Sequence, residues 1–157
     1  MTNRICNSIT TLLLHWPQRV AAHLTWAGPL VARLVVGYVF MLTGWNKLQH
    51  LPDMIQNFTD WGIPFPEILT PFVSGVECFG GVLLMLGLFT RVVGGMLTGV
   101  MIVAIFSAKF AEIDSLETLL GFEETLYAAL FFWLAIAGAG RVSIDHYFSK
   151  YRVHANG

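Results

Sequence analysis

The stretch ARLVVGYVFMLTGWNKLQ, residues 32–49, is apolar enough to enter a lipid bilayer but carries a basic side chain near each end. Five of its residues recur at alternating spacings of four and three and therefore share one stripe of a helix: Arg33, Gly37, Phe40, Gly44 and Lys47. A cation at membrane depth costs about 3 kcal/mol or more unless an opposite charge meets it. Because the glycines let a second helix approach closely, this stripe predicts a packed interface with an acidic partner.

The whole composition is that of an integral membrane protein. Of 157 residues, 55% are hydrophobic and only 12% are charged, and the mean hydropathy is +0.65. A net charge of -1 argues against a nucleic-acid partner, since such proteins present basic surfaces to phosphates. The two cysteines, Cys6 and Cys78, lie far apart without a Cys/His cluster, so we expect neither a metal site nor a disulfide framework.

The hydropathy pattern predicts an all-α fold, a four-helix membrane bundle with an N-terminal interfacial helix. Each apolar run is close to the ~20 residues that cross a bilayer. The predicted spans are 29–48, 71–89, 92–110 and 122–139. They form a membrane domain over residues 29–146, preceded by segment 1–28, whose interfacial helix starts near Leu13, and followed by tail 147–157.

Basic residues predict the orientation of the bundle. They precede the first span, occupy the short link between the second and third, and follow the fourth: Arg4, Arg19, Arg91, Arg141, Lys150 and Arg152. The other two loops are acidic. By the positive-inside rule we expect a multi-pass protein of the bacterial inner membrane with both termini in the cytoplasm.

Apart from Glu123 and Glu124 at the very start of the fourth span, Glu77 is the one acidic residue inside a predicted span, and it is the expected partner of Lys47. Asn46, Tyr127 and Glu124 fall at a similar depth in the outer half of the bundle. These side chains could hold the polar head of a small molecule, or the two charges could be a purely structural pair.

The loop between the first two spans contains an amphipathic helix from Pro52 to about Asp60. Its apolar face could either anchor at the membrane surface or close a cavity as a lid. In the third span, glycines at 94, 95 and 99 predict a second close-packed seam, and such seams would also suit a homodimer.

A second polar group is expected at the inner ends of the spans. Arg33 lies about one turn inside the membrane and is predicted to reach Asp145. Ser143 is a predicted N-cap for a short terminal helix. Arg91 and Arg141 complete this set, whose role we interpret as structural.

In its order of motifs, the chain resembles the DoxX family of four-helix bacterial membrane proteins. The matching stretches are RLVVGYVFMLTGWNKL, GIPFP, VECFGGVLLMLGLFTR and GAGRVSID, at residues 33–48, 62–66, 76–91 and 138–145. The resemblance implies a membrane subunit linked to quinones, since founding relatives are associated with thiosulfate:quinone oxidoreductase and a terminal quinol oxidase.

The first functional hypothesis is a quinone-linked membrane subunit of a system that oxidises sulfur compounds or thiols. No histidine lies inside a predicted span, so no haem ligand pair is available, and no intrinsic cofactor other than bound quinone is expected. Electrons would come from a redox partner subunit or a thiol substrate. The alternatives are a non-enzymatic docking or scaffold protein and a small-solute transporter.

Overall fold

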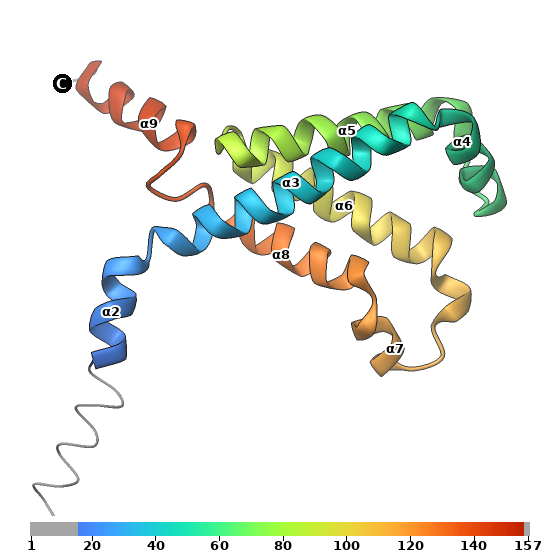
Figure 1. Ribbon diagram of the computed structural model, residues 1–157, viewed down its shortest axis with the longest axis horizontal. Coiled ribbons are helices and arrows are strands. Elements are labelled where there is room, and N and C mark those ends of the chain that lie inside the picture. The colour runs from blue at the N-terminus through green and yellow to red at the C-terminus, as the bar shows by residue number, and fades with distance from the viewer. Residues whose placement is uncertain (1–15, 156–157) are drawn as a thin grey trace, which may run out of the picture.

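The computed structural model describes residues 16–155, which fold into helices with no strand among them (Figure 1). In chain order the elements are α2 (Trp16–Leu24), α3 (Ala27–Gln49), α4 (Leu51–Asp60), α5 (Pro66–Leu86), α6 (Thr90–Ala108), the 3-10 helix η2 (Phe110–Glu112), α7 (Leu116–Gly121), α8 (Glu123–Ala137) and α9 (Ile144–Ala155). The all-α prediction is confirmed. The predicted N-terminal helix is present as α2, whereas Leu13 lies outside the described residues.

The long helices form two pairs, α3 with α5 and α6 with α8. Figure 1 shows these pairs side by side near α9 and diverging toward α4 and α7. We call these two ends of the bundle the α9 end and the α4 end. The pairs are joined by the α5–α6 turn and by a core in which the ring of Phe40 packs edge-on against Tyr127 and Phe131, with ring centroids 5.1 and 4.7 Å apart.

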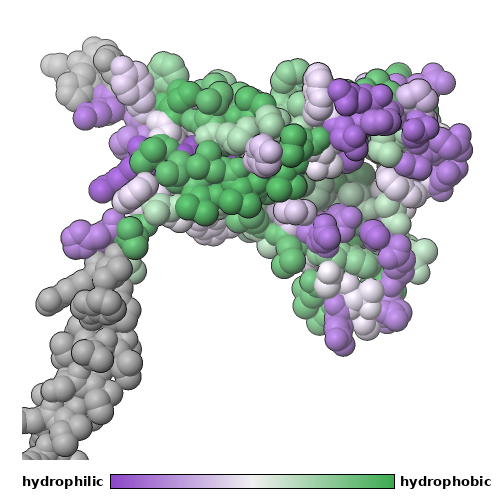
Figure 2. Space-filling model, viewed as in Figure 1, coloured by the Kyte–Doolittle hydropathy of each residue, from purple (hydrophilic) through white to green (hydrophobic). Residues whose placement is uncertain are grey.

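In the described part of the chain, three helices are long and apolar enough to cross a membrane: α3, α5 and α6. Figure 2 shows a broad hydrophobic surface between two hydrophilic ends, the pattern of a membrane-embedded protein. The fourth predicted span, α8, has 15 residues and an axial length of about 22 Å, shorter than the hydrocarbon layer. The prediction of spans is thus confirmed for three helices, and for α8 it stays a prediction.

Helix α5 begins at Pro66, five residues before the predicted second span, and continues through Pro71. Proline suits the first helical turn, where its missing N–H has no carbonyl to bond. Phe65, in the left-handed region with φ 51°, turns the chain into the helix. Pro71 deprives only the Glu67 carbonyl of its usual helical partner, so the helix passes through it.

A glycine seam brings the backbones of α3 and α5 into contact, as the stripe on residues 32–49 predicted. A Cβ atom on Gly44 would lie 2.7 Å from the Ser74 carbonyl oxygen, and one on Gly37 would lie 2.7 Å from that of Gly81. Both distances are shorter than real Cβ contacts, so neither position accepts a larger residue without moving a helix.

The second predicted seam is only partly correct. Gly94 faces α8, where an added Cβ would lie 2.9 Å from the Phe131 carbonyl oxygen. Gly95 and Gly99, by contrast, have no atom within 4 Å of such a Cβ and are exposed on α6. Helix α8 packs against the face of α6 that carries Gly94, and Gly95 and Gly99 lie on a different face.

The acidic loop between α6 and α8 contains η2 and α7, two short helices that were not predicted from the sequence. Ser115 caps α7 by accepting a hydrogen bond from the Thr118 backbone N–H at 3.2 Å. The Thr118 hydroxyl donates to the carboxylate of Asp114, and this hydrogen bond lowers the pKa of Asp114 below its ordinary value. A short, capped helix therefore leads the chain into α8.

The close α3–α5 contact yields a stability test at Gly44. We expect Gly44→Leu to lower the thermal unfolding midpoint strongly, because its side chain would collide with the α5 backbone at Cys78 and Ser74. The matched control is Gly75→Leu on α5, where an added Cβ meets nothing within 4 Å. Circular dichroism melts in one detergent would compare the two variants, and equal midpoints would contradict the contact.

Candidate functional site

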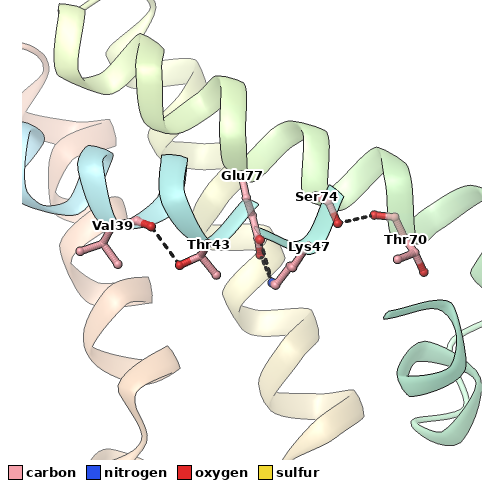
Figure 3. A network of polar contacts seen from close by, with 6 residues as sticks. All are labelled: Val39, Thr43, Lys47, Thr70, Ser74 and Glu77. Atoms are coloured by element: carbon pink, nitrogen blue, oxygen red, sulfur yellow. Dashed lines mark hydrogen bonds and ion pairs between the residues drawn. The ribbon is translucent and has the colours of Figure 1, made fainter. Parts of the chain in front are cut away.

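An ion pair between Lys47 and Glu77 joins α3 to α5 in the half of the bundle nearer α4 (Figure 3). The Lys47 Nζ donates to both carboxylate oxygens of Glu77, at 2.8 Å to Oε1 and 2.7 Å to Oε2. Glu77 is 2% exposed, while the Lys47 side chain is 26% exposed. The predicted partner of Lys47 is therefore the observed one, and the buried charge is neutralised.

The glycine seam explains why this pair forms. Gly44 lies one turn before Lys47 on α3, and Ser74 lies one turn before Glu77 on α5. Because Gly44 touches the backbone of Ser74 and Cys78, the two charged residues start from adjacent positions on facing helices. The long stem of lysine then needs only to fold back along the interface.

Hydroxyl groups on the same two helices bond mostly to their own backbone (Figure 3). Ser74 Oγ donates to the Thr70 carbonyl oxygen at 2.7 Å, and Thr43 Oγ1 donates to that of Val39 at 2.9 Å. The Thr70 hydroxyl is buried and has no hydrogen-bond partner within residues 16–155. Neither Ser74 nor Thr43 competes with Lys47 for the carboxylate.

The ion pair lines a cavity of about 590 Å³ between the two diverging helix pairs. Its walls are mostly apolar and come from α3, α5 and α6, with Phe72, Val100 and Met101 among them. Its polar groups are Thr43, Lys47, Glu77, Ser107, Lys109, Glu123, Glu124 and Tyr127. An apolar chamber with a few converging polar groups is the usual form of a small-molecule site.

The structure brings together four of the five residues predicted for the outer site. Lys47, Glu77, Tyr127 and Glu124 all line the cavity. Asn46 does not, because it is exposed on a different face of α3. Thr43, Ser107 and Glu123 were missed; Thr43 could have been found, since it lies four residues before Lys47 and so shares its face.

Helix α4 covers part of the cavity. Of the two roles considered for this amphipathic helix, this position favours a lid that closes the cavity over an anchor at the membrane surface. Phe58 is 7% exposed and, together with Trp61 and Ile63, contributes to the wall. The rings of Phe58 and Trp61 lie with their centroids 5.7 Å apart. The amphipathic pattern alone could not decide between the two roles, because both require the same apolar face.

At the α9 end, Arg33 and Asp145 lie near each other but bind different groups. Arg33 is 1% exposed and donates from Nη2 to the Val142 carbonyl oxygen, while its Nε and Nη1 have no hydrogen-bond partner among residues 16–155. Asp145 accepts from the backbone N–H groups of Phe89 and Thr90, at 2.8 and 3.0 Å. The expectation of a direct pair is thus corrected, because the start of α6 offers Asp145 two unpaired amides.

Ser143 caps α9 as predicted, accepting from the His146 N–H at 3.1 Å. The Asp145 N–H also donates to the Gly87 carbonyl oxygen at 3.0 Å, so α9 is tied to the α5–α6 turn. Gly87 has φ 66°, and a Cβ there would overlap the guanidinium of Arg33. These contacts tie the end of the chain to the α5–α6 turn, and the structural role that we interpret for this polar group stays a prediction.

The remaining predicted cations, Arg91 and Arg141, are exposed around a hollow at the same end. Within residues 16–155, the structure contains no group of three or more His, Cys, Asp or Glu side chains that could hold a metal ion. What the main cavity offers instead is a lysine, carboxylates and a phenol, groups that hydrogen-bond to ligand oxygens and exchange protons.

Comparison with known proteins identifies the family. The DoxX family model matches residues 28–109. The chain is 29% identical over 136 residues to the Bacillus subtilis protein named "Putative oxidoreductase CatD", covering 82% of this chain and 92% of that one. It is also 29% identical over 125 residues to the Escherichia coli inner membrane protein YqjF, covering 78% and 93%.

An uncharacterized Haemophilus influenzae protein is 34% identical over 122 residues, covering 75% of this chain and 88% of the relative. No solved structure matches the chain significantly. The family match covers more than half of the sequence and includes both helices that carry the ion pair. The chain therefore belongs to the DoxX family of membrane proteins.

Proposed function

We propose that this chain is a quinone-binding membrane subunit of a redox system, with the quinone head group in the cavity beside Lys47 and Glu77. The observation that carries the proposal is a neutralised ion pair, Glu77 2% exposed, at the wall of an otherwise apolar cavity. Its volume, about 590 Å³, lies within the range of small-molecule sites.

The chemistry of the lining suits a quinone. A quinone carbonyl accepts hydrogen bonds, which Lys47 Nζ and the Tyr127 hydroxyl can donate. Phe72, 60% exposed, and Val103, 57% exposed, line the cavity on α5 and α6, so the wall continues onto the surface that we place in lipid. An isoprenoid tail could leave the cavity there while the head remains at the ion pair.

The proton balance also fits. Reduction of a quinone to a quinol takes two electrons and two protons, and Glu77, Glu124 and Tyr127 are groups that can pass protons. Helices α3, α5, α6 and α8 contain no histidine, so we assign electron delivery to a partner subunit or to a sulfur or thiol substrate. The relative's name, an oxidoreductase, is consistent with this assignment.

We place the protein in the bacterial inner membrane, as the name of the Escherichia coli relative states for that protein. We further propose that the α9 end, with Arg91 and Arg141, faces the cytoplasm, as do both termini. The cavity then lies in the outer half of the membrane, and α4 covers it from outside.

Exposed glycines on α6 support the proposed homodimer. Gly95 and Gly99 are four residues apart, as in the small-residue motif that pairs membrane helices. Within residues 16–155 no atom lies within 4 Å of a Cβ position on either glycine, and Gly99 also lines the cavity. We expect Gly95→Leu to shift the protein from dimer to monomer in lipid nanodiscs, counted by single-molecule photobleaching. Gly75→Leu is the control; a monomeric wild type would contradict the proposal.

Quinone occupancy tests the proposed function. Wild type, Glu77→Gln and Lys47→Met are purified in native lipid particles, and bound quinone is extracted and counted by mass spectrometry. We expect near-stoichiometric quinone in wild type and a loss of about tenfold or more in both variants, because each loses a charged hydrogen-bonding group. Glu67→Gln, the same change at an exposed site of α5, should leave occupancy unchanged.

A folded wild type without quinone, confirmed by titration with a short-chain quinone, would overturn the proposal. It would favour the docking protein, in which Lys47 and Glu77 only hold α3 to α5. That alternative has one observation in its support, the bidentate geometry of the pair, which fully neutralises both charges without any ligand. Retention of quinone in both folded variants would place the head group elsewhere.

A further inference from the structure

A second hollow, of about 510 Å³, opens at the α9 end of the bundle, far from the ion pair. It lies where α6 begins, α8 ends and α9 begins. Its polar lining includes Arg91, Arg141, His146, Ser149 and Asp145. None of these side chains belongs to the cavity beside Glu77, so the proposed quinone site does not explain them.

The hollow carries positive charge that no ion pair within residues 16–155 neutralises. Neither Arg91 nor Arg141 forms an ion pair with any residue between 16 and 155. Asp145 is the one carboxylate in the lining, and its two oxygens already accept from the amides of Phe89 and Thr90. Two guanidinium groups thus share one hollow with a single, already engaged anion.

Local geometry holds Arg91 in this unfavourable place. Arg91 is the second residue of α6, where the positive end of the helix dipole disfavours a cation. Its guanidinium lies against Gly138, whose added Cβ would be 3.3 Å from Nε and 3.4 Å from Nη2. Gly138 has φ 81°, so the turn after α8 both requires glycine and leaves room for the arginine.

The surroundings of the hollow are apolar on the membrane side. Phe89 and Val92, which also line it, are 62% and 61% exposed. Val92 points outward from α6, one of the three helices long enough to cross the bilayer. A ligand that suits the hollow therefore has an anionic head for the two arginines and hydrocarbon that runs along the α6 surface.

We propose that this hollow is a binding site for the phosphate head group of an anionic phospholipid, held by Arg91 and Arg141. Guanidinium groups match phosphate oxygens in a planar, two-pronged arrangement that lysine does not provide. Basic pockets between membrane helices bind anionic lipid heads in this way. The bound lipid would neutralise the junction of α5, α6, α8 and α9 and fix its depth in the bilayer.

Native mass spectrometry tests this site. Protein is equilibrated with equal amounts of phosphatidylglycerol and phosphatidylcholine, and retained lipids are counted. We expect wild type to retain one phosphatidylglycerol selectively, and Arg91→Gln and Arg141→Gln each to retain about fivefold less. Glu67→Gln, which changes one charge at an exposed site of α5 that lines neither hollow, should retain the wild-type amount. Circular dichroism confirms that each variant is folded.

Two results would overturn the proposal. Equal retention of both lipids by wild type, or unchanged selectivity in both folded arginine variants, would show that the hollow does not select an anionic head. Competition with inorganic phosphate and with glycerol 3-phosphate separates the two sources of the same chemistry. Displacement of the lipid by millimolar inorganic phosphate would assign the site to a soluble phosphate instead.

Discussion

The carboxylate of Glu77 has to be neutralised because it lies in an apolar helix that crosses the membrane, and Lys47 does this. An unpaired charge at that depth would cost several kcal/mol, whereas a carboxylate that accepts two hydrogen bonds from an ammonium group is stable there. The pair can form only if α3 and α5 touch, which Gly44 and Gly81 allow. One electrostatic requirement thus fixes the register and spacing of this helix pair, and the glycine seam is its sequence signature.

The arrangement of the other pair follows from the first. Helices α6 and α8 pack on each other through Gly94 and meet α3 through the aromatic contacts of Phe40. At the α9 end, Asp145 binds the start of α6 to the end of the chain. At the α4 end the two pairs diverge and enclose the cavity, with α4 over part of it. The hydrogen bonds that join the helices at the α9 end and the cavity at the α4 end are consistent with the proposed site for a small amphiphile.

Much of this organisation could be predicted from the sequence. A charged residue inside an apolar helix requires a partner of opposite charge, and glycines on the same face indicate a closely packed neighbouring helix. The contact between Lys47 and Glu77 was predicted because they are opposite charges at a similar depth in neighbouring spans. Tyr127 and Glu124 were assigned to the same site because they lie at that depth too. Asn46 was misplaced since depth does not specify which way a side chain points around the helix. Arg33 and Asp145 were paired by charge alone, whereas the free amides of α6 were the stronger attraction. Helix α5 extends beyond the predicted second span to Pro66, because Pro71 removes one backbone hydrogen bond without ending the helix. Family membership added the expectation of a quinone, which no pattern of residues establishes by itself.

A double-mutant cycle on Lys47 and Glu77 tests the central claim most directly. Unfolding free energies are measured for wild type, Lys47→Met, Glu77→Gln and the double variant, in the same mixed micelles. Each single change should destabilise the protein by about 3 kcal/mol, because one charge is left buried without a partner. The double variant should lose less than the sum of the single losses, with a coupling energy of about 1 to 3 kcal/mol. Single losses that add within about 0.5 kcal/mol would contradict the account, since the two residues would then not act as a pair.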